Sequence, residues 1–151
     1  MGLLKEIGGG PVGLDTSIFI YLIEENPRYL PLIEPAFLAL DDGDLRGATS
    51  SLTLLETIVM PLRRGNRTVV ERYEVLLTHG SGLRLVDIDR RVLQAAAHLR
   101  AVTSIKTPDA LQLASSMLAG CPVFLTNDDR IPAVPGLRVL CLDDFLEGAP
   151  S

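Results

Sequence analysis

Short apolar segments alternate with longer amphipathic segments along almost the whole chain, and this alternation most restricts the folds open to it. Residues 122–126 form a largely apolar run of the kind that is buried on both faces of a parallel sheet. Further strands are predicted for residues 11–14, 45–50, 83–88 and 137–142. The segments between them have helical periodicity. The pattern therefore predicts an α/β fold, a three-layer α/β/α sandwich around a central, mainly parallel sheet.

The chain has the size and composition of one globular domain. It has 151 residues, of which 47% are hydrophobic, and this is enough to build one core. Gly8-Gly9-Gly10 predicts a flexible leader over residues 1–12, because no Gly-Lys-Ser/Thr follows to complete a phosphate-binding loop. The domain itself is then expected over residues 13–147.

Charge, cysteine content and hydropathy restrict where in the cell the protein is expected and which partners it can bind. The net charge of −5 argues against nucleic-acid binding over the whole surface, but it leaves binding through a local basic patch or through metal ions. Cys121 and Cys141 lie in apolar runs without metal-ligand spacing, which is typical of small buried side chains in a reducing compartment. No run approaches the roughly 20 apolar residues of a membrane span and no signal peptide is visible, so we expect a cytoplasmic protein without membrane contact.

The segment after Lys106 reads as the start of a helix. Thr107 is a residue type that caps helices, Pro108 suits the first helical position, and Asp109 follows in the first turn. Apolar residues then recur at helical spacing as far as Leu118, which predicts one buried face. Taken alone, Asp109 fits an acid that complements the helix dipole. A functional role requires other acids at the same place.

Three other acids are expected at the same edge of the sheet. Asp15 ends the first predicted strand, and Asp128 ends the fourth. Glu56 lies in the helix after the second strand, although Thr53 and Glu56 also fit a capping box at the start of that helix. In parallel α/β sheets, sites form outside the carboxyl ends of the strands. All four acids can therefore meet there.

Carboxylates gathered at one place repel each other unless their pKa values rise or cations neutralise them. Oxygen ligands without Cys or His favour Mg²⁺, with Mn²⁺ as a substitute. Mg²⁺ keeps several waters and leaves room for a phosphate oxygen. The natural chemistry of such a site is hydrolysis of a phosphodiester by a metal-activated water.

Arg63, Arg64 and Arg67 form the densest basic cluster of the chain. A solvated helix face explains such a cluster. The sharper alternative is that these side chains contact the phosphates of a nucleic acid.

The resemblance to a known family rests on motifs that recur in a fixed order. They are Asp15-Thr16-Ser17 after a strand, Leu52-Thr53-Leu54-Leu55-Glu56, Pro108-Asp109-Ala110 at a helix start, and Thr126-Asn127-Asp128. In this order they resemble PIN domains, and most of all the VapC-type toxins of bacterial and archaeal toxin–antitoxin pairs. The resemblance extends from about Gly13 to Phe145.

The resemblance implies an α/β/α sandwich with Mg²⁺-dependent ribonuclease activity. It implies that the metal is held by the acids that match the family's, which are Asp15, Glu56, Asp109 and Asp128. The hydroxyl of Thr126, and that of Thr16 or Ser17, would orient the carboxylates. Because Asp129 follows Asp128 directly, the sequence leaves open which of the two takes the fourth role. A homodimer and an inhibitory antitoxin protein are also implied.

Other functions remain open at this point. A PIN ribonuclease can act in RNA processing without an antitoxin. A phosphoacceptor domain also gathers acids at strand ends, but it needs a Lys near the last strand, and the chain has only Lys5 and Lys106. A dehalogenase-like phosphatase needs a second Asp two residues after Asp15, where Ser17 stands. A non-catalytic interaction domain is the remaining alternative.

Overall fold

The structure is a computed structural model that describes residues 2–146. Glu147, the last residue of the domain predicted from the sequence, lies outside the described residues.

A five-stranded parallel sheet forms the centre of the molecule. Its strands lie in the order β3-β2-β1-β4-β5, and each pairs in parallel with its neighbours. They are β1 (Val12–Leu14), β2 (Gly47–Ser50), β3 (Leu83–Val86), β4 (Val123–Thr126) and β5 (Arg138–Cys141). The strand positions and the parallel pairing confirm the sheet that the alternating pattern predicts.

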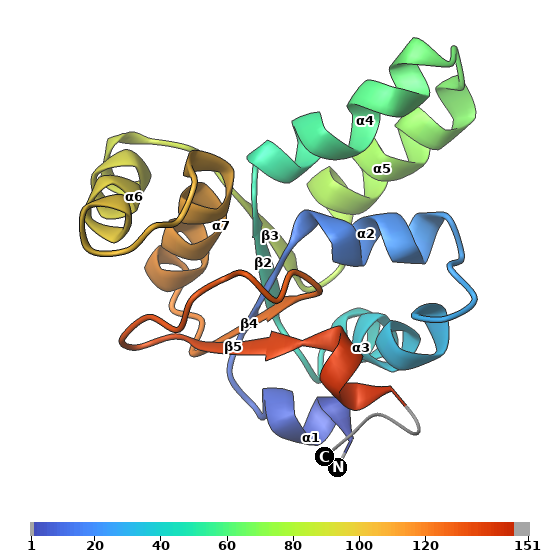
Figure 1. Cartoon of the computed structure of the whole chain (residues 1–151). Helices are drawn as coiled ribbons and strands as arrows, with labels where there is room; N and C mark the ends of the chain where they lie inside the picture. Colours follow the sequence, from blue (N-terminus) through green and yellow to red (C-terminus); the bar gives the residue numbers. More distant parts are fainter. Residues whose placement is uncertain (1, 147–151) are drawn as a thin grey trace.

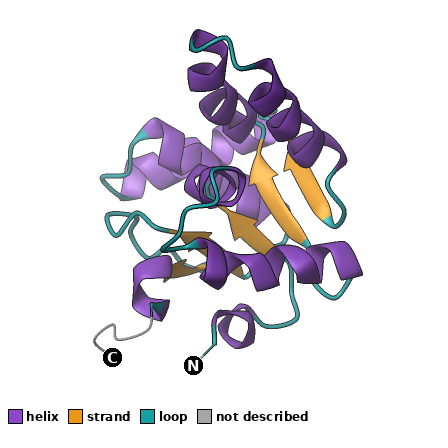
Figure 2. Cartoon of the chain, turned by 90° about the vertical axis from the view of Figure 1, so that its right-hand side faces the viewer, coloured by secondary structure: helices purple, strands orange, loops and turns teal. Residues whose placement is uncertain are grey.

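Helices cover both faces of this sheet (Figure 1). They are α1 (Leu3–Ile7), α2 (Thr16–Ile23), α3 (Leu30–Asp42), α4 (Leu52–Arg63), α5 (Arg67–His79), α6 (Arg90–Val102) and α7 (Thr107–Leu118), followed by the 3₁₀ helix η1 (Leu142–Phe145). Helices α6 and α7 pack on one face, while α1, α2, α3 and α5 pack on the other. Figure 2 shows the strands enclosed between these layers. The three-layer α/β/α prediction is confirmed.

Each face of the sheet has its own apolar core. Val12 and Leu14 of β1 join Phe19 and Ile33 in the core on the α2–α3 side. Phe124 of β4 belongs to the core on the α6–α7 side. Neighbouring side chains of a strand point to opposite faces, so a strand buried on both faces contributes to both cores.

The segment before β1 differs from the flexible leader that the glycines predict. Residues 3–7 form α1, and Leu3 and Ile7 are 5% and 3% exposed within the core below α3. The apolar residues of this segment outweigh its glycines, because burying two aliphatic side chains contributes several kcal/mol, about 1.5–3 each.

Two predictions about individual side chains have different outcomes. Cys121 is buried as expected, and burial raises the pKa of its thiol to about 11, whereas Cys141 is only partly buried. The helical spacing of Val92, Ala96 and Leu99 predicts that Val102 is also buried, but it is 78% exposed at the last residue of α6. No helix in residues 2–146 is long and apolar enough to cross a membrane.

Gly13 allows β1 and α7 to approach closely. An added Cβ at Gly13 would lie 2.7 Å from Ser116 Cβ and 2.9 Å from a ring carbon of Phe124. These distances are shorter than real Cβ contacts, so only glycine fits between the central strand and the helix that carries Asp109.

Candidate active site at the carboxyl edge of the sheet

A pocket of about 460 Å³ opens at the carboxyl ends of β1 and β4. The chain leaves β1 toward β2 on one side, and it later returns to place β4 on the other side. This reversal of strand order is where open α/β sheets form their binding crevices. All the acids predicted from the sequence line this pocket: Asp15, Glu56, Asp109, Asp128 and Asp129.

Asp15 stands at the junction of β1 and α2. It is the N-cap of α2, and its Oδ1 accepts a hydrogen bond from the Thr16 amide at 2.9 Å. Its Oδ2 accepts from the Thr126 hydroxyl at 2.7 Å. Burial raises the pKa of Asp15, the hydrogen bonds from Thr126 and Thr16 partly offset that rise, and repulsion by Asp109 and Glu56 adds to it.

Glu56 reaches the pocket from the interior of α4. The helix begins at Leu52, so Glu56 is not part of a capping box with Thr53, and that interpretation is wrong. The Thr53 hydroxyl instead contacts Thr49 Oγ1 at 2.8 Å beneath the pocket. The Thr16 hydroxyl donates to Glu56 Oε1 at 2.7 Å and thereby connects α2 with α4.

Asp109 lies in the first turn of α7, as predicted, but the cap of this helix differs. The helix begins at Thr107, and Lys106 is its N-cap, without a side-chain capping bond. Thr107 Oγ1 instead accepts a hydrogen bond from the Arg100 guanidinium at 2.9 Å. Burial raises the pKa of Asp109, and repulsion by Asp128 adds to this effect. Asp109 therefore interacts with the neighbouring acids of the pocket as well as with the helix dipole.

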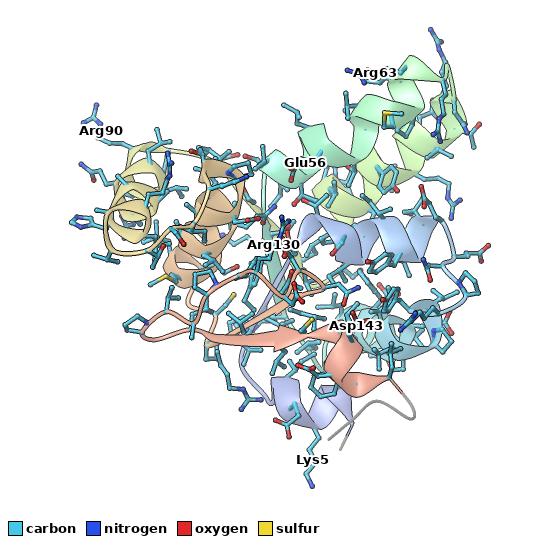
Figure 3. The ribbon with its side chains drawn as sticks, in the orientation of Figure 1. Lys5, Glu56, Arg63, Arg90, Arg130 and Asp143 are labelled. Atoms are coloured by element: carbon cyan, nitrogen blue, oxygen red, sulfur yellow. The ribbon has the colours of Figure 1, made fainter. Side chains whose placement is uncertain are left out.

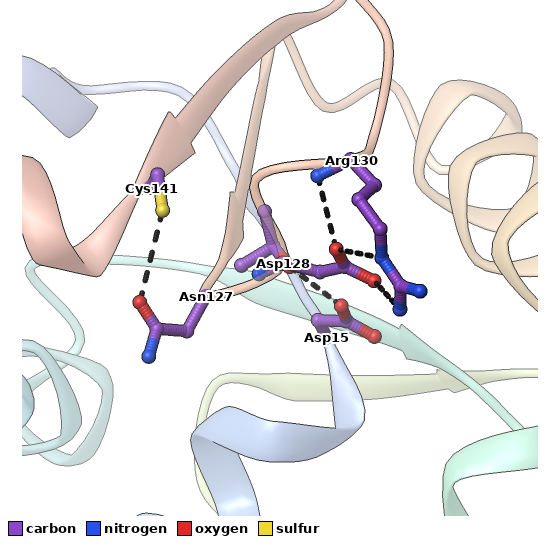
Figure 4. A network of polar contacts seen from close by, with 6 residues as sticks. Asp15, Asn127, Asp128, Arg130 and Cys141 are labelled. Carbon is purple, nitrogen blue, oxygen red and sulfur yellow. Dashed lines mark hydrogen bonds and ion pairs between the residues drawn. The ribbon is translucent and has the colours of Figure 1, made fainter.

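Asp128 follows β4 and is held by Arg130. Its Oδ1 and Oδ2 each lie 3.0 Å from a guanidinium nitrogen of Arg130, and this pairing lowers the pKa of Asp128 (Figure 4). The Asp128 amide donates to Thr126 Oγ1 at 3.0 Å. Asp129 lines the same pocket but is exposed. The geometry therefore favours Asp128 as the acid coupled to the rest of the group.

The remaining predicted residues are placed differently. Ser17 lines the pocket, and its buried hydroxyl has no hydrogen-bond partner within residues 2–146. The predicted basic cluster lies at the turn between α4 and α5, where Arg63, Arg64 and Arg67 are all exposed. Figure 3 shows Arg63 at the outer end of α4, away from Glu56 and Arg130.

The donor set fits a hard divalent cation. Carboxylate and hydroxyl oxygens dominate the lining, and burial, with a smaller contribution from repulsion among the acids, raises the pKa values of Asp15 and Asp109. No three acidic, His or Cys side chains among the described residues already converge on one metal position. Arg130 is the only basic side chain among the described residues that line the pocket, and it pairs with both oxygens of Asp128.

Sequence reasoning missed several residues of the pocket. Gln112, Tyr21 and Asn127 all line it. Gln112 follows Asp109 by three residues on α7, so helical spacing places both on one face. A polar residue amid apolar neighbours at that spacing was the available signal.

The comparisons with known proteins agree with this geometry. The family model described as "PIN domain" matches residues 12–137. The structure of VapBC2 from Rickettsia felis bound to a DNA fragment from their promoter is similar, with a TM-score of 0.66 and 17% identity, over 87% of this chain and 98% of that one. A toxin–antitoxin complex from Klebsiella pneumoniae has a TM-score of 0.62 and 21% identity, over 85% and 94%. No curated protein sequence matches this chain. The chain belongs to the PIN domain family.

Proposed function

We propose that this protein is a ribonuclease of the VapC type, the toxin of a toxin–antitoxin pair, and that it hydrolyses RNA phosphodiester bonds with Mg²⁺. One observation carries the proposal: carboxylates from four separate segments line one pocket, and repulsion among them helps to raise the pKa of Asp15 and of Asp109. PIN domains are a nuclease family, and the two similar structures are toxin–antitoxin complexes.

In this proposal, Asp15, Glu56, Asp109 and Asp128 hold the metal, with Mn²⁺ as a substitute for Mg²⁺. When bound, a divalent ion lowers the pKa of a coordinated water and offsets charge on a phosphate oxygen. The protein supplies the orientation. The hydroxyls of Thr126 and Thr16 fix Asp15 and Glu56 by hydrogen bonds of 2.7 Å each.

Exposed side chains on α4 and at the α4–α5 turn support the proposed partners. Arg63, Arg64 and Arg67 offer phosphate contacts at the tip of the α4–α5 pair. Leu55 and Leu62 of α4 are 61% and 57% exposed, which suits coverage by a second copy of the chain or by an antitoxin. A cytoplasmic location and a homodimer belong to the same proposal.

The phosphoacceptor alternative requires a lysine in this pocket. Neither Lys5 nor Lys106 is among the residues that line it. A PIN ribonuclease without an antitoxin has the same site, so only a partner experiment separates it from the toxin. The cleavage assay distinguishes the ribonuclease from a non-catalytic interaction domain, which would not cut RNA.

The test is cleavage of a set of fluorescent single-stranded RNA oligonucleotides with Mg²⁺ or with EDTA. Cleavage by the parent protein is expected to require Mg²⁺ and to be absent from Asp15→Asn and Asp109→Asn. Asp44→Asn, at an exposed acid outside the pocket, is the matched control and should cut at the parent rate. Equal rates for Asp109→Asn and Asp44→Asn would overturn the metal assignment.

The toxin role is tested by purifying the protein from its native host and identifying any small protein that co-purifies with it. A partner that co-purifies and blocks RNA cleavage is the expected result. A protein that cuts RNA but is recovered without an inhibitory partner is a ribonuclease outside a toxin–antitoxin pair.

A further inference from the structure

Gln112 lies beneath the acidic pocket at the point where three acid-bearing segments meet. It is only 2% exposed, and its side chain reaches α2, α4 and the end of β2. Its Nε2 lies 2.8 Å from Thr53 Oγ1 and 3.2 Å from Thr16 Oγ1. Its Oε1 lies 3.4 Å from the backbone nitrogen of Ser50.

The orientation of this amide is determined by its neighbours. The Ser50 backbone nitrogen can only donate, so the amide oxygen must face it. The amide nitrogen, with two hydrogens, therefore faces the hydroxyls of Thr16 and Thr53. Gln112 thus donates to both hydroxyls.

The remaining protons can then be assigned. Thr16 has one hydroxyl proton, and the carboxylate of Glu56 can only accept, so Thr16 donates to Glu56 at 2.7 Å. Thr49 donates its proton to the Leu14 carbonyl at 2.7 Å and must therefore accept from Thr53 at 2.8 Å. Both chains of donation begin at Gln112.

This directionality matters for Glu56 because its side chain has no other hydrogen bond within residues 2–146. A hydroxyl that accepts from an amide donates more strongly to a carboxylate, since hydrogen bonds in a chain polarise one another. Without Gln112, the Thr16 and Thr53 hydroxyls, 3.2 Å apart, can pair with each other instead. Thr16 would then turn away from Glu56.

We propose that Gln112 is a positioning residue, which fixes the Glu56 carboxylate for metal binding by directing the proton of the Thr16 hydroxyl. The inference rests on the proposed function, because it assigns Glu56 to the metal. A positioning role of Gln112 differs from a purely structural role, because a purely structural role would affect stability but not the affinity for the ion.

The first experiment measures Mn²⁺ binding by calorimetry for the parent protein, Gln112→Met and Gln94→Met. Gln94 is the other glutamine of the chain and is exposed on α6, so its variant is a matched control. We expect Gln112→Met to weaken Mn²⁺ binding about 10- to 100-fold, the range for residues that orient metal ligands. Unchanged affinity in a folded Gln112→Met protein overturns the proposal, as does a parent protein that binds no Mn²⁺.

Variants of Thr16 keep the proposal testable if Gln112→Met fails to fold. Thr16→Val should weaken Mn²⁺ binding as Gln112→Met does, and Thr16→Ser should restore it. In the double variant the two losses should not add, because both act through one hydrogen bond. Parent affinity in Thr16→Val overturns the proposal.

A metal-free measurement tests the hydrogen bond itself. The side-chain amide resonances of Gln112 and Gln94 are assigned by NMR from their absence in the two Met variants. Thr16→Val should shift the Gln112 amide protons and leave those of Gln94 in place. A parent protein that binds Mn²⁺ but cuts no RNA would reject the proposed function and leave the role of Gln112 decided by these measurements.

Discussion

Thr126 and Asp15 are joined by a 2.7 Å hydrogen bond although they lie 111 positions apart in the sequence. The same hydroxyl accepts the amide proton of Asp128 at 3.0 Å. One buried oxygen therefore fixes the first and the fourth acid relative to each other.

Replacing Thr126 by Val is expected to remove both bonds without a large change in volume. The loss leaves buried partners unpaired and should lower the free energy of unfolding by about 1–3 kcal/mol. Activity with Mg²⁺ should fall about 10- to 100-fold. Urea unfolding and the RNA cleavage assay measure the two effects. Thr126→Ser should recover most of both, and a Ser variant as impaired as Val would contradict the role of the hydroxyl.

Asp109 makes the stability of the metal-free protein depend on pH. In the folded protein the pKa of Asp109 is raised above the ordinary value of 3.8. At pH values between the ordinary pKa and the folded pKa, the folded protein therefore binds a proton that the unfolded chain has lost. Stability should therefore fall as the pH rises through this window, and the charged carboxylate should remain destabilising at neutral pH. Asp109→Asn is expected to be the more stable protein at neutral pH without metal, with the difference vanishing below about pH 3.8.

Adding Mg²⁺ should reverse this order. An ion that binds the folded protein alone stabilises it, whereas the Asn variant lacks one ligand for that ion. Thermal unfolding across pH, with EDTA and with Mg²⁺, measures both effects. A variant that is less stable than the parent in EDTA at neutral pH would contradict a destabilising charge on Asp109.

Arg130 supplies the positive charge that a metal would otherwise provide to Asp128. The Arg130 side chain is largely exposed, at 82%, so the pair contributes little to stability. Arg130→Ala is expected to tighten Mg²⁺ binding modestly, because the ion no longer competes with the guanidinium for Asp128. Calorimetry measures the affinity. Arg138→Ala, which removes the pair with Glu6 outside the pocket, is the control and should leave it unchanged.

Gly13→Ala tests the close packing of β1 against α7. The added methyl would collide with Ser116 and Phe124, and the strain should cost about 1–3 kcal/mol of unfolding free energy. Ser116→Ala is the comparison, because its buried hydroxyl has no partner within residues 2–146 and its removal should be neutral or stabilising. Urea unfolding of both variants measures this. Equal stability of Gly13→Ala and the parent would mean that α7 can shift away without cost.

The sequence predicts the sheet well because its signal is local. A strand buried on both faces must be apolar throughout, and β4 is fully buried, as residues 122–126 suggest. The expected position of the acids at the strand ends follows from chain direction alone. Their roles as metal ligands remain predictions.

Other features depend on contacts that no local pattern contains. Thr107 has the type of a cap residue, but Arg100 of the preceding helix binds its hydroxyl. Gln112 is recognisable only when α2, α4 and α7 are placed together. The strand order, which brings β4 beside β1, is also a long-range property, and it decides that Asp15 and Asp128 share a pocket.

The late addition of β4 to the free edge of β1 has a consequence for synthesis. While the ribosome is still making α6 and α7, β1 is an edge strand, and Asp15 has neither the Thr126 hydroxyl nor Asp128 nearby. A nascent or truncated chain that ends before β4 therefore carries three of the acids without the assembled pocket. The chain can acquire the site that we assign to RNA cleavage only after β4 has been made.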